Sequence, residues 1–240
     1  MKITITRSLQ EFYSVSAWKI ADEMIHNPRA VVGLATGRTT TGIHAELAKI
    51  YAEHPFDTSA VTVFGMDEIT NVSREFAGSC YDMILRQVVQ PLNIPMENYI
   101  MPPTYSDDFE RECKVFEQAI EARGGVDLQI LGIGENGHLG FNQPGTPFGS
   151  TTWVSCMDDA LDELIRRESN SAPDADLGGL TLVIRNLMQS RKLILVANGK
   201  NKTEIVKQAL YGPVCEAVPA SVLQLHPFVE VILDPEAAGN

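Results

Sequence analysis

The sequence predicts an α/β fold built on an open, doubly wound parallel sheet with helices on both faces, a Rossmann-like architecture. Short and nearly continuous apolar runs of strand length recur along the chain, as strands buried on both faces require. Segments in which apolar residues recur at helical spacing separate these runs. The chain has 240 residues, of which 44% are hydrophobic and 21% charged, so we expect residues 1–240 to form a single domain.

Each expected element is defined by an apolar run or by helical spacing. The helix at 109–120 has the clearest signal, because Phe109, Cys113, Phe116 and Ile120 recur at helical spacing. Ser106 and two aspartates precede it, and two glycines follow it, as start and stop signals. In chain order the sequence predicts a strand at 31–35, a helix at 43–51, a strand at 61–66, a loop, a helix around 81–88, the helix at 109–120, strands at 128–133 and 193–197, a helix at 202–210, and a last strand at 229–233.

Residues 147–176 depart from this alternation of strands and helices. The segment mixes Ser, Thr, Asp and Pro with one helical piece at 157–167. A segment this long outside the regular pattern predicts a lid or binding flap over a site, with a solvated surface excursion as the alternative.

The composition excludes several classes of partner. With 19 basic and 31 acidic residues the net charge is −12, which argues against binding nucleic acid or an anionic membrane. The N-terminus lacks a signal-peptide core and no apolar stretch is long enough to span a membrane, so we expect a cytoplasmic protein. The four cysteines are widely spaced, which predicts free thiols in place of disulfides or a zinc site.

The glycine-rich stretch at 131–145 is the strongest functional signal in the chain. It follows the apolar run at 128–133 and holds five glycines around His138, an arrangement typical of a loop against which a ligand lies. Residues 132–137 match the dinucleotide fingerprint G-x-G-x-x-G, which requires a helix after its third glycine. Gly140, Pro144 and Gly145 would interrupt such a helix, so we do not expect a dinucleotide cofactor.

Four polar junctions follow the expected strands, at 36–40, 67–68, 135–138 and 198–202. In open parallel sheets ligands bind beyond the carboxyl ends of the strands, so these junctions should converge. Their convergence predicts an enzyme site.

The junction at 36–40 has the features of an anion site. Thr36, Gly37, Arg38 and Thr39 join a strand to a helix, and a helix start offers backbone N–H groups and a favourable dipole to an anion such as phosphate. The alternative is a threonine-rich helix cap without a ligand. Lys202, near a second helix start, is the candidate counter-charge, although an isolated lysine is also typical of a solvated surface.

Two further junctions carry groups that exchange protons. Asp67 and Glu68 follow an apolar run, and partial desolvation there would raise the pKa of a carboxyl group toward that of a general base; the alternative is a turn or cap residue. His138 can donate and accept protons near neutral pH. The chain has no G-x-S-x-G elbow, which argues against a serine hydrolase.

Three segments at 34–39, 66–69 and 131–145 together resemble the glucosamine-6-phosphate deaminase/isomerase family, and the likeness extends to 223–227. The resemblance implies phosphate binding by Thr36 to Thr39 and Lys202, proton transfer between C2 and C1 of the sugar by Asp67, and assistance to ring opening by His138. It places Glu68 and Gly137 beside the substrate. The implied reaction converts a phosphorylated amino sugar to a ketose 6-phosphate and ammonia, with no cofactor and no metal; assembly of several copies of the chain is left open.

The chain departs from the family's pattern at two positions. Asn136 and Gln143 stand where glucosamine-6-phosphate deaminases have an aspartate and a glutamate that orient and charge the imidazole. Asn136 and Cys80 are more similar to a galactosamine-6-phosphate branch, which favours that epimer slightly, whereas Gln143 is unusual in both. Two alternatives are a 6-phosphogluconolactonase-like sugar-phosphate hydrolase and a non-catalytic sugar-phosphate sensor.

Overall fold

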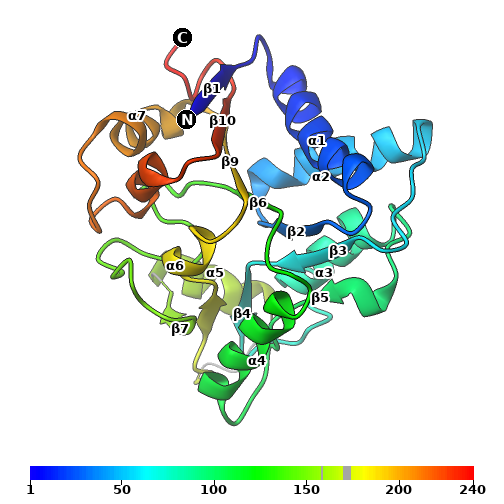
Figure 1. Ribbon diagram of the computed structural model, residues 1–240. Helices are drawn as coiled ribbons and strands as arrows, with labels where there is room; N and C mark the ends of the chain where they lie inside the picture. Colours follow the sequence, from blue (N-terminus) through cyan, green and yellow to red (C-terminus); the bar gives the residue numbers. More distant parts are fainter. Residues whose placement is uncertain (158, 170–173) are drawn as a thin grey trace.

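A seven-stranded parallel sheet forms the centre of the computed structural model, which describes residues 1–157, 159–169 and 174–240. Its strand order is β1-β10-β9-β6-β2-β3-β5, and every neighbouring pair is parallel (Figure 1). The expected doubly wound parallel sheet is therefore confirmed. The strands are β1 (Lys2–Ile5), β2 (Val31–Leu34), β3 (Thr62–Gly65), β5 (Tyr99–Ile100), β6 (Leu128–Leu131), β9 (Lys192–Ala197) and β10 (Val229–Leu233).

Helices cover both faces of this sheet, as side chains on its central strands show. Within β9, Ile194 and Val196 pack into a core with α1 and α2, whereas Leu193 and Leu195 pack on the opposite side with α4 and α7. This two-sided burial explains why the strands read as continuous apolar runs. The helices are α1 (Leu9–His26), α2 (Arg38–Glu53), α3 (Cys80–Ile84) continued by the π-helical η1 (Leu85–Val89), η2 (Met96–Asn98), α4 (Phe109–Glu121), α5 (Asp159–Ser169), α6 (Ile184–Leu187), η3 (Lys200–Lys202), α7 (Thr203–Tyr211) and η4 (Pro219–Leu225).

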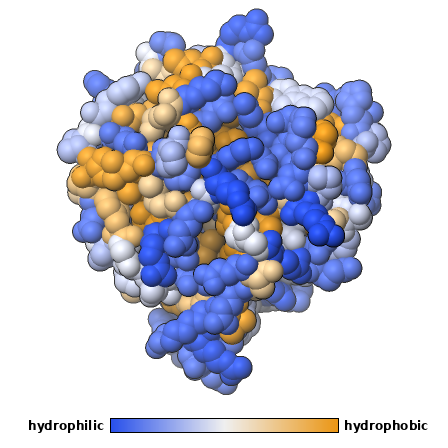
Figure 2. All heavy atoms as spheres, viewed as in Figure 1, coloured by the Kyte–Doolittle hydropathy of each residue, from blue (hydrophilic) through white to orange (hydrophobic). Residues whose placement is uncertain are grey.

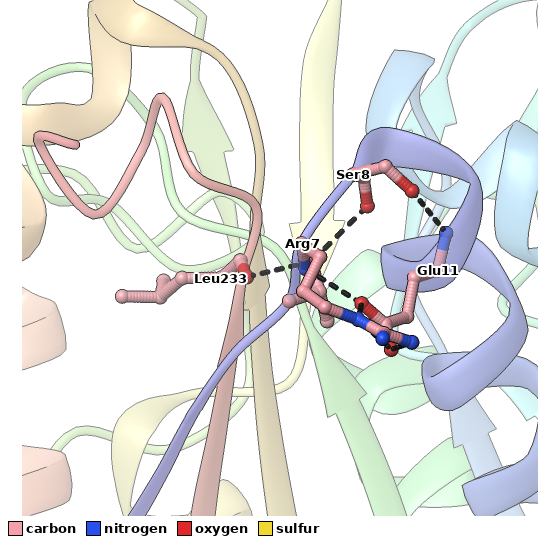
Figure 3. Close-up of polar contacts among 5 residues, drawn as sticks. Arg7, Ser8, Glu11 and Leu233 are labelled. Carbon is pink, nitrogen blue, oxygen red and sulfur yellow. Dashed lines mark hydrogen bonds and ion pairs between the residues drawn. The ribbon is translucent and has the colours of Figure 1, made fainter.

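The N-terminal β1 and α1 were not predicted from the sequence. At their junction the Ser8 hydroxyl accepts a hydrogen bond from the Glu11 N–H, and the Glu11 carboxylate accepts one from the Arg7 N–H (Figure 3). This arrangement is close to a capping box, whose S-x-x-E signature was present in the sequence. Just before it, the Thr6 N–H donates to the Leu233 carbonyl and continues the pairing of β1 with β10.

A second, antiparallel sheet was also not predicted. Its order is β4-β8-β7, formed by Asp67–Thr70, Gly178–Thr181 and Trp153–Cys156. The expectation of a loop directly after the strand at 61–66 was wrong, because Asp67 and Glu68 begin β4. Met66 joins the sheets: its N–H donates to Leu34 at the end of β2, and its carbonyl accepts from Leu182 just after β8.

The segment at 147–176 contributes β7 to the second sheet and carries α5. Positions 158 and 170–173 of this segment lie outside the described residues. Its role as a lid therefore stays a prediction.

The described residues pack into three apolar clusters. The face of α4 seen in Figure 2 is mainly hydrophilic, while its buried side chains are Cys113, Phe116 and Ile120. All four cysteines are free thiols, as expected. Among the described residues no helix is long and apolar enough to cross a membrane.

His44 gives the fold a specific sensitivity to acid. It is fully buried on α2, its Nδ1 lies 3.0 Å from Gln87 Oε1, and burial lowers its pKa from 6.5 to about 4. Between pH 6.5 and pH 4 the unfolded chain therefore binds a proton at His44 that the folded chain does not bind. Because of this difference, the free energy of unfolding falls as the pH drops from 6.5 toward 4. Between pH 7 and pH 5 we expect this group to cost about 2 kcal/mol.

Urea unfolding at the two pH values measures this cost. His44→Met should lose about 2 kcal/mol less than the wild-type protein on acidification. The exposed His54→Met serves as the matched control and should behave like wild type. Equal losses in wild type and His44→Met would contradict the assignment.

Candidate active site

The polar junctions converge where the strand order of the main sheet reverses. β3 and β5 lie on one side of β2, whereas β6, β9 and β10 lie on the other, so loops leave the carboxyl ends of β2 and β6 in opposite directions. This switch point is where open α/β sheets bind ligands. Hydrogen bonds join the loops: the Thr39 hydroxyl donates to Asn198 Oδ1 at 2.6 Å, and Asn201 Nδ2 donates to Glu135 Oε1 at 2.6 Å.

The start of α2 forms an anion-binding corner. α2 begins at Arg38, and its cap residue Gly37 has a φ of 134°, with no side chain closing the helix end by a hydrogen bond. A Cβ at Gly37 would meet no atom within 4 Å, so the space beside this backbone is open. Backbone N–H groups at such an end favour phosphate or carboxylate.

Lys202 adds positive charge to the same corner. It ends η3, directly before α7, and is half-buried. Burial lowers the pKa of Lys202, Glu135 raises it and Arg38 lowers it further, which shows that these charges face one another. Two cations at two helix starts are groups that favour a phosphate dianion, and the expected binding of phosphate here stays a prediction.

The corner predicts a measurable loss of phosphate affinity in Lys202→Met. Removing a charged contact to phosphate should weaken binding of inorganic phosphate by about 10- to 100-fold, as calorimetry would show. The matched control is Lys200→Met, two positions earlier and fully exposed, which should bind phosphate as wild type does. Unchanged affinity in Lys202→Met would remove this residue from the site.

Asp67 is a desolvated carboxylate at the junction of the two sheets. Its side chain is 8% exposed. Burial raises the pKa of Asp67 to about 7, the neighbouring Glu68 carboxylate raises it, and the Cys80 thiol lowers it. A carboxylate with a pKa near neutrality is suited to taking and returning a proton.

Glu68 is placed differently from Asp67. It is fully buried, and its two oxygens accept the backbone N–H groups of Ile69, Cys80 and Tyr81 at 2.7–2.9 Å. Burial raises its pKa, while these hydrogen bonds lower it. This geometry anchors the first turn of α3, and the expected contact of Glu68 with substrate stays a prediction.

The loop that carries His138 packs against Asp67. At Gly140, which has a φ of 59°, an added Cβ would lie 3.0 Å from Asp67 Oδ2, so glycine allows the loop to approach the carboxylate. The half-buried ring of His138 lies against Gly134, whose N–H donates to the His138 carbonyl. Residues 132–152 contain no helix, so the structure lacks the element that a dinucleotide fingerprint needs.

Asn136 and Gln143 form one hydrogen-bonded unit. Asn136 Nδ2 donates to Gln143 Oε1 at 3.0 Å, and Asn136 Oδ1 accepts the backbone N–H of His138 at 3.2 Å. Two carboxylates in these places would repel each other, whereas two amides hold the loop by a neutral contact. Gly137, next to Asn136, has a φ of 88°, and a Cβ there would lie only 2.9 Å from Val218 and 3.2 Å from Ile205, so glycine fits this position. Any direct contact of Gly137 with substrate stays a prediction.

The structure also shows contacts at this site that the sequence did not predict. Asn198 holds Thr39, and Thr181 Oγ1 accepts the N–H of Phe141 from the His138 loop. Cys80 joins Thr36 to Asp67, with Sγ 3.1 Å from Thr36 Oγ1 and 3.7 Å from Asp67 Oδ1. The sequence carried a partial signal for Cys80, which is similar to the galactosamine-6-phosphate branch. Among the described residues no group of three His, Cys, Asp or Glu side chains is arranged to hold a metal ion.

An anion-binding corner beside a buried carboxylate, at the switch point of a doubly wound sheet, defines a Rossmann-like α/β enzyme. Residues 7–231 match the family model described as glucosamine-6-phosphate isomerases/6-phosphogluconolactonase. The chain belongs to this family.

Individual relatives span the whole chain. It is 36% identical over 239 residues to the glucosamine-6-phosphate deaminase of Thermoanaerobacter pseudethanolicus, covering 100% of this chain and 94% of the relative. It is 37% identical over 240 residues to the glucosamine-6-phosphate deaminase of Clostridium botulinum strain Langeland, covering 100% and 98%.

Solved structures agree with these relatives. A monomeric glucosamine-6-phosphate deaminase superposes with a TM-score of 0.93 at 33% identity, covering 100% of this chain and 99% of that one. A 6-phosphogluconolactonase from Trypanosoma brucei superposes with a TM-score of 0.78 at 21% identity, covering 100% and 98%, and shares the fold.

Proposed function

We propose that the protein is an amino-sugar-6-phosphate deaminase/isomerase, which converts a hexosamine 6-phosphate and water to a ketose 6-phosphate and ammonia. The observation that carries the proposal is the position of Asp67, a carboxyl group with a pKa near 7. A single residue, Met66, separates it from the sheet whose loops form the anion-binding corner. The relatives of similar length that are named as glucosamine-6-phosphate deaminases support it.

The reaction follows from these groups. The corner formed by Thr36, Gly37, Arg38, Thr39 and Lys202 holds the phosphate, and His138 moves a proton at the ring oxygen so that the sugar opens to its aldehyde form. Asp67 removes the proton from C2 and returns it to C1, while the oxygen on C1 takes up a proton and the amino nitrogen gives one up, which leaves a hydroxyl group at C1 and an imine at C2. Water adds to that carbon, the C–N bond breaks, and ammonia leaves as the ketone forms.

Ammonia release from purified protein tests the proposal. Galactosamine 6-phosphate and glucosamine 6-phosphate are supplied separately, and the expected result is release from at least one of them. The named relatives favour the glucosamine epimer, whereas Asn136 and Cys80 are more similar to the galactosamine branch. The ratio of the two kcat/KM values decides between the epimers, and release from neither would overturn the proposal.

A lactonase on the same fold is the second candidate, supported by the family description, which includes 6-phosphogluconolactonase. It would release acid from 6-phosphogluconolactone and no ammonia from an amino sugar. A phosphate-binding sensor would bind the sugar phosphate and release neither product. Parallel assays of acid and ammonia release separate the three functions.

A further inference from the structure

Cys80 lies between the two parts of the proposed site. It is 6% exposed and is the first residue of α3, which follows the cap residue Ser79. Its sulfur is 3.1 Å from the hydroxyl of Thr36, in the loop after β2, and 3.7 Å from Asp67 Oδ1, in β4. A single side chain therefore contacts both the phosphate corner and the carboxylate.

The direction of these hydrogen bonds follows from the atoms involved. Burial raises the pKa of the Cys80 thiol well above its usual range, so the group carries its proton. That proton points to Asp67 Oδ1, an acceptor, which leaves the sulfur lone pairs for the Thr36 hydroxyl. The result is an ordered relay in which Thr36 donates to Cys80 and Cys80 donates to Asp67.

The backbone of Cys80 is fixed independently of its thiol. The Cys80 N–H donates to Glu68 Oε1 at 2.9 Å, and the next N–H, of Tyr81, donates to Glu68 Oε2 at 2.7 Å. Adjacent carboxylates of β4 thus contact Cys80 at two places, Glu68 at the main chain and Asp67 at the side chain. The main chain that carries the thiol is therefore held by Glu68, which takes no part in the relay.

We propose that Cys80 is a positioning residue, which orients the Asp67 carboxylate by donating its thiol proton and links it to the phosphate loop through Thr36. The role deepens the proposed function, because it rests on Asp67 acting as the base. The thiol does not contact substrate in this role. It sets the rotation of the carboxylate and favours its ionised form.

The other charged groups around Asp67 do not replace this contact. Glu68 faces Asp67 from the same strand and raises its pKa, while Arg74 acts on Glu68. The ionisable hydroxyl of Tyr99 lies on the Glu68 and Cys80 side of the cluster, where burial raises its pKa and keeps it neutral. The hydrogen bond from Cys80 lowers the pKa of Asp67, whereas burial and the Glu68 carboxylate raise it.

The direct test is a pH titration that gives the protonation midpoint of Asp67. The titration is monitored by the infrared carbonyl band of this carboxyl group, which is identified as the band that Asp67→Asn removes. Cys80→Val fills the site without a donor, and Cys80→Ala removes both volume and donor. Both should raise the midpoint by about 0.5–1 pH unit, because the ionised carboxylate loses a hydrogen bond. Cys80→Ser restores a donor and should bring the midpoint back to near the wild-type value.

A double-mutant cycle tests the link to Thr36. Thr36→Val, measured without phosphate, should raise the midpoint by a smaller amount in the wild-type background and by nothing in Cys80→Val. Cys113→Val is the matched control, since it replaces a buried cysteine on α4, outside the site, and should leave the midpoint unchanged.

The outcomes are separable from those of the proposed function. Ammonia release tests the reaction, whereas the infrared titration needs no turnover. A midpoint that stays at the wild-type value in Cys80→Val, or that rises equally in Cys80→Ser, would overturn the positioning role. An additive effect of Thr36→Val in both backgrounds would overturn the link to the phosphate loop.

Discussion

Asp67→Asn is expected to lower kcat for ammonia release by about 10³-fold or more, the largest effect of any substitution considered. A positioned general base contributes about 10²- to 10⁴-fold, and in the proposed function Asp67 moves the proton on which the whole conversion depends. The amide keeps the size of the side chain, so inorganic phosphate should bind with wild-type affinity. Asp57→Asn, at an exposed position, is the matched control and should retain full activity. Turnover retained in Asp67→Asn would contradict the base assignment.

The same variant should be more stable than wild type above pH 7. The pKa of Asp67 is raised from 3.8 to about 7, so the folded state holds a proton that the unfolded chain has released, and stability falls as pH rises through this range. Asparagine removes this cost, which amounts to as much as about 4 kcal/mol at pH 8 and vanishes below pH 4. A loss of activity together with a gain in unfolding free energy would distinguish a missing base from a misfolded protein.

His138→Gln should lower kcat by about 10²- to 10³-fold at neutral pH, because glutamine can hydrogen-bond but cannot exchange a proton. The loss should be smaller for a substrate already in the open-chain form, since the residue's proposed work is ring opening. Steady-state assays with both forms of substrate measure the difference. His26→Gln, at the exposed end of α1, is the control. Equal losses with ring and open-chain substrates would move His138 to another step.

The central sheet was predictable because burial on both faces leaves a plain mark in the sequence. Its inner strands cannot tolerate polar residues on either side, so they appear as apolar runs between helices. β1 leaves no such mark, since it is an edge strand whose Ile3 and Ile5 are partly exposed. The second sheet is hidden for a different reason: β4 begins with two acidic residues and β8 with two glycines, both poor strand formers.

The site was predictable in its loops and less so in its contacts. The rule that ligands bind at the carboxyl ends of parallel strands is enough to predict from the sequence that Thr36, His138 and Lys202 lie in one region. The position of Asp67 was expected, but its surroundings were not: burial and Glu68 raise its pKa, and a hydrogen bond from Cys80, 13 residues away in the chain, lowers it. Such contacts depend on where α3 is anchored, which local sequence patterns do not encode.

The backbone of Met66 connects the two sheets, to which the proposed function gives different roles. In the proposed function, the loops of the large sheet bind the phosphate group, which many sugar phosphates share. β4 and the His138 loop contact the sugar ring, where those sugars differ. Substitutions around the small sheet can then alter the reaction without disturbing phosphate binding. Because the two roles belong to different sheets, members of one family can catalyse different reactions and still recognise the phosphate of their substrates in the same way. This fits a family description that covers both an isomerase and a lactonase.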